Sequence, residues 1–398
     1  MRKLAVPLSE YENRIDRCKE KAIERGYDAL LVYSHTPDKP GNVRYLTNYC
    51  SPVSLHNSNL PDQPVRRTTP DTCLVLPVEG EPVLIKMPLT IPPDGFVTTL
   101  PIEIATKDVR EYERDITETI AQVVKEKHLE KKKIGFAGED VISAHLMRII
   151  KEKLPEVKFG YADDILYKMR IIKSENEIVL MRKTGAMADK FLKIVSESIR
   201  PGVKMKDIFG LTAEIIMKNG AERLNFIDVC AGQVMQWYYG KKVFENGDLI
   251  MVDFGFVDPN GYFADVARSF TIGEADTKTK DLVRLCKDTN DFIAEQAIPG
   301  IRGQEWLEKT RTFVKNSIKN GKYGLPLPEP VMFLAHSLGL DGNSYFFDSE
   351  ADMELKENMS LAIENFTYIP GFNAARFENM AIVTKKGAEF LTKYRYGT

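Results

Sequence analysis

Two aspartates, Asp253 and Asp265, interrupt an apolar stretch from Gly247 to Gly273 that has the pattern of a β-hairpin. Its turn is predicted at 258–261, where Pro fixes one backbone dihedral and Gly accepts a positive φ. Aspartate is depleted in strands, and a buried carboxylate without a partner is costly. The two residues lie almost symmetrically about the turn, so we expect them on one face, opposite or diagonal to each other. Two carboxylates facing one small-walled space need a cation between them. Separate roles in turn capping or in lysine pairing are the simpler alternative.

Three later residues share this character. His336 lies in FLAHSLGLD, while Glu364 and Glu378 lie in the strand-like runs MSLAIENF and AARFENMAIV. Taken singly, each has a simpler interpretation, as a core histidine or as a glutamate paired with a base such as Arg376. Four acids with one imidazole form an oxygen-rich set that suits a pair of Mn, Fe, Co or Zn ions better than a structural zinc site. Two such ions lie ~3.5–4 Å apart, share a hydroxide and stabilise an oxyanion.

The chain before about residue 160 alternates between predicted strands and helices. Ser9 and Glu12 have the spacing of a capping box for a first helix. This alternation predicts a small α/β domain with a mixed sheet. Its expected elements are a strand at 28–34, an extended segment at 42–49, a hairpin at 72–87, a helix at 111–127, a strand at 133–137 and a helix at 144–154.

The pattern then changes. Ser174 and Glu177 form a second capping box, and apolar residues recur at helical spacing up to Ile199. Helices are predicted near 206–219, 278–297 and 303–320, and the remainder is rich in strands. We therefore predict an N-terminal domain at 1–163 and a catalytic domain at 164–398.

Composition limits the partners and the compartment. The 398 residues suit two domains, and a net charge of -2 gives no electrostatic case for nucleic acid or an anionic membrane. The five cysteines are scattered and lack CxxC spacing, which is typical of a reducing compartment rather than of a disulfide framework. The N-terminal sequence lacks the apolar segment of a signal peptide, and no run is long enough to cross a bilayer. We expect a cytoplasmic protein.

The order Asp, Asp, His, Glu, Glu in these contexts resembles the metal-ligand signature of the M24 family, which has the pita-bread fold of methionine aminopeptidase, aminopeptidase P, prolidase and creatinase. The resemblance covers about 165–398 well and the N-terminal domain more loosely. The matching segments are VDFG with GYFADVARSF, AHSLGLD, LKENMSLAIEN, ARFENMAIVTKKG, and LYKMRIIKSENEI, which resembles the opening of the catalytic domain.

The resemblance implies an α+β pita-bread catalytic domain of two similar halves, preceded by a smaller creatinase-like or prolidase-like α/β domain, and a homodimer. It also implies two divalent metal ions. Asp253 and Asp265 bind them, with Asp265 bridging, His336 and Glu364 bind one ion, and Glu378 bridges both. Glu364 is also the implied catalytic residue, since in the family this position can shuttle a proton.

This chain departs from the family's peptidases at two histidines beside the scissile bond. The corresponding residues are Gln236 and Asn343, and His336 is the single histidine of the catalytic domain. Glutamine and asparagine hydrogen-bond a substrate but carry no proton at neutral pH. Trp237 follows Gln236 and offers an aromatic wall, although ordinary loop packing is the simpler interpretation. These three residues and Arg376 are the candidate substrate-binding residues.

The predicted function is a dinuclear metal-dependent hydrolase resembling Xaa-Pro dipeptidases, in which a metal-bound hydroxide attacks a C–N bond of a dipeptide or small amide-like substrate. The missing histidines support an alternative, a lyase or deaminase of small molecules with the same fold and metals. A third possibility is a non-catalytic binding module. Such modules typically lose metal ligands, whereas all five are retained here.

Overall fold

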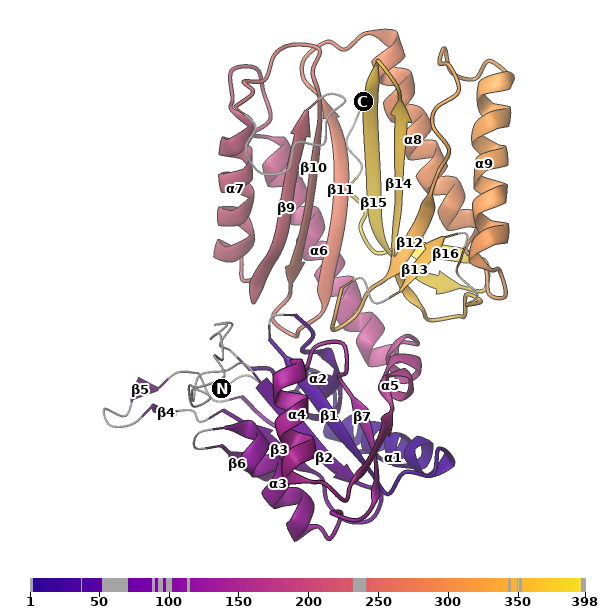
Figure 1. Cartoon of the computed structure of the whole chain (residues 1–398). Helices are drawn as coiled ribbons and strands as arrows, with labels where there is room; N and C mark the ends of the chain where they lie inside the picture. Colours follow the sequence, from indigo (N-terminus) through magenta and orange to yellow (C-terminus); the bar gives the residue numbers. More distant parts are fainter. Residues whose placement is uncertain are drawn as a thin grey trace. The chain divides into compact units, whose positions relative to one another are not determined.

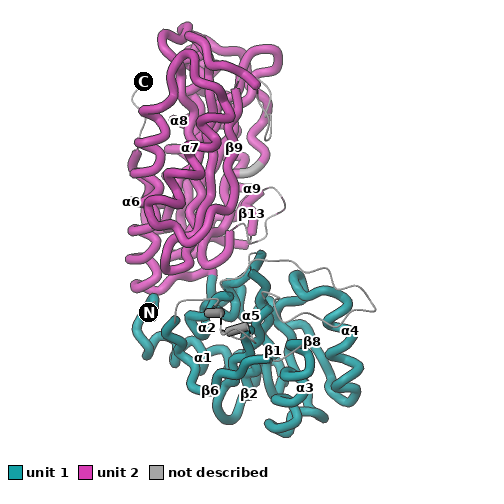
Figure 2. Tube along the Cα trace, turned by 90° about the vertical axis from the view of Figure 1, so that its left-hand side faces the viewer, with its two compact units in different colours: residues 1–170 teal, residues 171–398 magenta. Residues whose placement is uncertain are grey.

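The computed structural model describes residues 3–36, 38–51, 71–87, 90–91, 96–97, 102–112, 115–231, 241–342, 345–348, 350 and 353–394. The chain divides into two compact units, Met1–Arg170 and Ile171–Thr398, coloured separately in Figure 2. The boundary predicted from the sequence, between residues 163 and 164, falls in the first turn of helix α5 (Asp163–Arg170), and the structure includes this helix in the first unit.

The first unit contains a mixed six-stranded sheet in the order β6-β3-β2-β1-β7-β8, as the alternating pattern predicts. Strand β1 pairs antiparallel with β2 and parallel with β7, so the predicted hairpin at 72–87 joins a partly parallel sheet. Its strands are β1 (Ala29–His35), β2 (Asp71–Pro77), β3 (Val83–Lys86), β6 (Asp108–Glu111), β7 (Lys133–Ala137) and β8 (Lys158–Tyr161), with the short pair β4 (Thr90–Ile91) and β5 (Phe96–Val97) apart from it. The helices are α1 (Leu8–Glu24), α2 (Gly41–Thr47), α3 (Ile116–Glu126), α4 (Ala144–Lys153) and α5.

Two local predictions in this unit are wrong. The segment predicted as extended at 42–49 forms helix α2. All residues of this helix except Asn42 are buried, so its sequence has no apolar period that distinguishes a helix from a strand. Asn48 ends this helix in the left-handed region, at a φ of 66°. The Ser9 capping box does not form, because α1 begins at Leu8 after Pro7 and has no side-chain cap.

The second unit contains an eight-stranded sheet in the order β13-β12-β14-β15-β11-β10-β9, with β16 paired to β15. Helices α6 and α7 pack beside β9–β11, and α8 and α9 beside β12–β15, which gives two halves of similar construction (Figure 1). The strands are β9 (Arg223–Ala231), β10 (Leu249–Val257), β11 (Phe263–Thr271), β12 (Phe333–Ser337), β13 (Phe346–Asp348), β14 (Ser360–Ile369), β15 (Asn373–Thr384) and β16 (Gly387–Phe390). The helices are α6 (Glu175–Ser196), α7 (Met205–Lys218), α8 (Thr277–Gln296) and α9 (Gly303–Lys319).

Helix α6 begins as predicted. The Ser174 hydroxyl accepts a hydrogen bond from the Glu177 backbone N–H at 3.1 Å, and the Ser174 N–H donates to the Glu177 carboxylate at 3.0 Å. This reciprocal capping box satisfies two N–H groups that the helix leaves without internal partners.

Side-chain alternation decides which face of the large sheet carries the acids. The Phe256 ring of β10 lies 5.0 Å from the Phe191 ring of α6, and Asn379 of β15 hydrogen-bonds Asn290 of α8 at 2.7 Å. Successive strand residues point to opposite faces. Asp253 and Glu378 therefore point away from these helices.

The two halves of the sheet meet where β11 lies beside β15, with Ala267 opposite Glu378. Side chains supply further bonds at this junction. The Ser269 hydroxyl donates to the Arg376 carbonyl at 3.1 Å and accepts from the Arg376 N–H at 2.9 Å. The Arg268 guanidinium donates to the Glu378 carbonyl at 2.5 Å. The junction between the halves is thus fixed in register by side chains as well as by backbone pairing.

All five cysteines are buried as free thiols. Among the described helices, none is both long enough and apolar enough to cross a membrane.

Candidate metal centre

The hairpin of β10 and β11 places the two aspartates as its sequence predicts. Asp253 pairs with Ala267 and Asp265 pairs with Gly255, so the aspartates are diagonal neighbours on one face. The Asp258 carboxylate holds the turn, because its Oδ1 accepts from the N–H groups of Asn260 at 2.8 Å and Tyr262 at 2.9 Å. A one-residue slip would move both aspartates to the helix-covered face.

The sheet carries these aspartates in a row of acids. Across five adjacent strands the paired residues are Asp228 on β9, Asp253 on β10, Ala267 on β11, Glu378 on β15 and Glu364 on β14. Asp265 precedes Ala267 by two residues and so shares its face. The row exists only because β15 lies against β11, which brings acids from both halves together.

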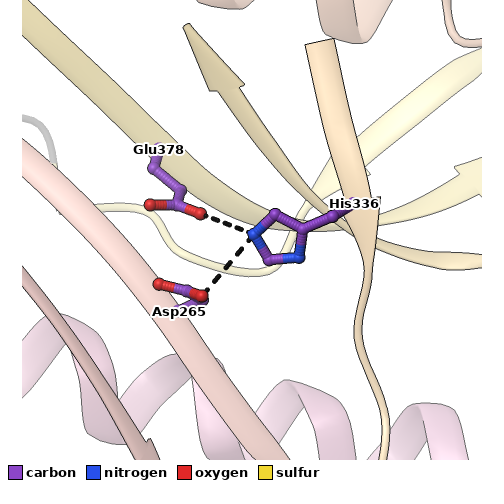
Figure 3. A group of neighbouring side chains, drawn as sticks. All are labelled: Asp265, His336 and Glu378. Atoms are coloured by element: carbon purple, nitrogen blue, oxygen red, sulfur yellow. Dashed lines mark hydrogen bonds and ion pairs between the residues drawn. The ribbon is translucent and has the colours of Figure 1, made fainter. Parts of the chain in front are cut away.

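His336 of β12 points into one end of this cluster. Its Nε2 atom lies 3.1 Å from Glu378 Oε1, 3.5 Å from Asp265 Oδ2 and 3.9 Å from Glu364 Oε2. Figure 3 shows the imidazole directed at the carboxylates of Asp265 and Glu378. The ligand atoms of Asp265, His336 and Glu378 all lie within 4.8 Å of one another, a spacing that a single metal ion can bridge.

Arg376 occupies the other side of the cluster. It precedes Glu378 by two residues on β15 and therefore points to the same face. Its Nη1 lies 2.5 Å from Asp253 Oδ2, while Nη2 forms an ion pair with Glu364 and lies 3.3 Å from Glu378 Oε2. The simpler interpretation of a strand glutamate paired with Arg376 therefore holds together with the clustering of the acids.

The cluster contains oxygen atoms that fit a metal ion. Asp253, Asp265 and Glu378 are at most 2% exposed. The Oδ1 atoms of Asp253 and Asp265 are buried and have no hydrogen-bond partner among the described residues. A buried carboxylate oxygen without a partner is costly. A hard or borderline divalent cation beside a carboxylate-rich donor set removes that cost.

The cluster also shifts the acidities of its members. Burial raises the pKa of Asp253 and of Asp265 well above the ordinary range. Burial and the nearby Glu378 charge raise the pKa of Glu364 to about 7. Burial opposes ionisation of Glu378 as well, but Arg376 and the hydrogen bond from His336 outweigh it and lower its pKa. With no ion bound, the raised pKa of Glu364 lets this carboxyl group hold a proton close to neutral pH.

Asp253, Asp265 and Glu364 line a cavity of about 600 Å³ on this face of the sheet. Its walls are largely apolar and aromatic, and this size suits a small molecule. The apolar and aromatic lining residues are Phe226, Pro330, Val331, Met332, Phe346, Phe366 and Tyr368.

Of the remaining predicted site residues, the structure describes only one. Arg376 lies within the cluster, whereas Gln236, Trp237 and Asn343 fall outside the described residues. Asp228 was missed by the sequence analysis. It is 4% exposed, it lines the cavity, and burial raises its pKa. The signal that singled out the other acids, a carboxylate inside an apolar strand-like run, is present here in NFIDVCA.

The fold and the cluster define a metal-dependent hydrolase domain joined to a smaller α/β domain. Residues 179–385 match the model of metallopeptidase family M24, and residues 14–172 match the creatinase/prolidase N-terminal domain. The first match spans more than half of the chain, which therefore belongs to metallopeptidase family M24.

Similar proteins agree with this assignment. The chain is 29% identical over 249 residues to an Xaa-Pro dipeptidase of Pyrococcus horikoshii, a match that covers 61% of this chain and 69% of the relative. Among solved structures, an Xaa-Pro dipeptidase from Bacillus anthracis superposes with a TM-score of 0.73 at 22% identity, over 96% of this chain and 98% of that one. Proline aminopeptidase P II from Yersinia pestis gives a TM-score of 0.75 at 18% identity, over 97% and 96%. The predicted pita-bread fold and the predicted enzyme class, a metal-dependent hydrolase, are confirmed.

Proposed function

We propose that this enzyme is a two-metal hydrolase that cleaves a C–N bond of a dipeptide or small amide-like substrate. The observation that carries the proposal is the convergence of four acids and one histidine in a buried cluster. Its proposed ligands are Asp253, Asp265, His336, Glu364 and Glu378, and the proposed ions are drawn from Mn, Co, Fe and Zn. Two divalent ions would balance the negative charges of the four carboxylates in this set.

The bound ions would supply Lewis acidity and lower the pKa of water. Glu364 would accept a proton during attack and return it to the leaving nitrogen, because its carboxylate lies at the edge of the ligand cluster, lines the cavity and can act as a general base and acid. Arg376 would bind a substrate carboxylate once its own carboxylate partners are neutralised. The aromatic walls of the cavity would exclude water from the reacting bond.

Metal analysis tests the ligand set. The purified protein should contain two divalent ions per chain, and Asp265→Ala should lose most of them because it removes a bridging ligand. Glu389→Gln is a matched control, since this exposed carboxylate pairs with Arg182 outside the cluster. Full metal content in Asp265→Ala would contradict the ligand assignment.

A specific observation favours a second candidate, a lyase or deaminase with the same metals. By its resemblance to the family's peptidases, the chain has Gln236 and Asn343 at the positions of their two histidines, and His336 is the single histidine after residue 164. Loss of one donor that stabilises developing charge typically costs ~10²–10³ in rate. We therefore expect weak turnover of ordinary Xaa-Pro dipeptides.

The assay loads the enzyme with Mn, Co and Zn in turn and measures a panel of Xaa-Pro dipeptides. The double variant Gln236→His/Asn343→His should raise turnover if the histidines alone are missing. A wild-type kcat/KM of ~10⁴ M⁻¹s⁻¹ or more on any of these dipeptides, within the usual enzyme range, would establish an ordinary Xaa-Pro dipeptidase and exclude the second candidate.

A further inference from the structure

We propose that Asp228 binds a positively charged ammonium group of the substrate beside the metal centre. The inference rests on the proposed function only in placing the substrate in this cavity. It adds a specificity-determining residue and a chemical class of substrate, a molecule that carries a protonated amine next to an apolar portion.

The first observation is that Asp228 is a buried acid of the cavity that forms no ion pair with a described residue, although the charge of Arg376 acts on it from a longer distance. It is 4% exposed and lines the cavity. Its Oδ1 atom is buried and accepts no hydrogen bond from any described residue. The two basic groups of the site are engaged elsewhere, since Arg376 pairs with Asp253, and His336 with Glu378. In the described parts of the chain, no lysine, arginine or histidine forms an ion pair with Asp228.

The second observation is the place of Asp228 in the sheet. It stands opposite Asp253 on β9, two strands away from β11. Adjacent strands are ~4.8 Å apart, so its backbone lies ~10 Å from that of β11. Asp228 lies outside the five proposed ligands, and its buried Oδ1 accepts no hydrogen bond from a described residue. Asp228 is therefore free to bind a different cation, next to the Asp253 side of the metal centre.

The third observation is the aromatic ring beside this carboxylate. Phe226 precedes Asp228 by two residues on the same face of β9, and its ring covers Gly255, where an added Cβ would meet it at 2.4 Å. Phe366 and Tyr368 line the same cavity from β14. Aromatic faces attract cations and contact the carbon chain that carries them. A carboxylate beside the Phe226 ring, in a cavity whose far wall is also aromatic, selects an alkylammonium over an alcohol or an anion.

The test uses two small probes that differ in charge, n-hexylamine, which is protonated at pH 7, and 1-hexanol. Their binding is measured by calorimetry on the wild type, Asp228→Asn and Glu329→Gln. Glu329 is an exposed carboxylate on the same cavity and controls for general attraction of cations. The wild type should bind hexylammonium about 10- to 100-fold more tightly than hexanol, as a hydrogen bond to a charged group allows. Asp228→Asn should lose this preference, and Glu329→Gln should retain it.

A second arm identifies which ammonium group of a substrate is bound. Lys-Pro is compared with norleucine-Pro, and each with its N-acetyl form, as competitors of hexylammonium binding. Loss of competition on acetylation of norleucine-Pro assigns the α-amino group. Competition by N-acetyl-Lys-Pro assigns the side-chain amine.

If Asp228→Asn prefers hexylammonium over hexanol as strongly as the wild type does, the inference is overturned. An equal weakening of hexylamine and hexanol would also overturn it, since that result indicates a packing role. Asp228→Ser provides a second variant if Asp228→Asn does not fold, as checked by circular dichroism. Because these measurements need no turnover, failure of the proposed hydrolysis and failure of this inference are distinguishable.

Discussion

Replacing Arg376 by methionine tests how the cluster balances its charges. The substitution keeps an apolar stem of similar reach and removes the guanidinium that contacts three carboxylates, with Nη1 2.5 Å from Asp253 and Nη2 3.3 Å from Glu378. The Glu364 carboxylate loses its ion pair with the same nitrogen. Without metal, these acids would be left buried beside one another with His336 as their nearest remaining base.

The expected magnitude follows from this geometry. Removing one partner of a buried ion pair costs ~3–5 kcal/mol. Part of this cost is relieved by proton uptake, because Asp253 and Glu364 already have raised pKa values. We therefore expect Arg376→Met to lower the free energy of unfolding of the metal-free protein by ~3 kcal/mol at pH 8. Bound divalent ions take over the neutralising charge, so the loss in the metal-loaded protein should fall below ~1 kcal/mol.

The assay is urea unfolding followed by circular dichroism, with EDTA or with saturating Mn²⁺. Arg182→Met is the matched control, since its ion pair with Glu389 is partly exposed and such pairs contribute only ~0–1 kcal/mol. An equal loss of stability with and without metal would refute the reasoning. So would a metal-free loss no larger than that of Arg182→Met.

Four further outcomes are expected. The pKa of Glu364 in the folded, metal-free protein is about 7, which is higher than in the unfolded chain. Its contribution to the stability of this metal-free protein is therefore full below pH ~4.3 and is lost as the pH rises towards 7. Across this range, the urea midpoint of Glu364→Gln should decline less steeply than that of the wild type. Metal affinity should rise between pH 6 and 8, because binding displaces the protons of these acids, and competition with a chelator measures it. Gly255→Ala should destabilise by ~1–3 kcal/mol through its clash with the Phe226 ring, and Phe226→Ala should relieve that cost in thermal unfolding of the double variant. Light scattering should give a mass near twice 45.2 kDa if the chain forms the homodimer that we propose from its resemblance to prolidases.

Local sequence patterns were sufficient for the hairpin. Alternation and turn chemistry place Asp253 and Asp265 on one face, and the reciprocal bonds of Ser174 and Glu177 follow from their three-residue spacing. They were insufficient for 42–49, where burial on all sides removes the periodicity that separates a helix from a strand. Tertiary packing decides such segments.

The row of acids depends on a pairing that no local pattern contains. Asp228 and Glu364 are four strands apart, and cross-strand pairing aligns them in one row only because β11 pairs with β15. The contacts of Arg376 with three carboxylates arise from the same pairing. Sequence reasoning identified the individual acids by their improbable setting. It could not predict that Asp228 lies in the same row, because β9 was not predicted as a strand.

The junction of β11 and β15 would give the proposed ions a mechanical role. Two of the proposed ligands, Asp253 and Asp265, belong to one half of the sheet, and the other three belong to the second half. Ions held by both sets would clamp the halves together at the one place where Ala267 faces Glu378. Chelation would then loosen the contact between the two halves as well as remove the catalytic ions. The backbone amides of both strands should begin to exchange hydrogen with solvent together when the ions leave.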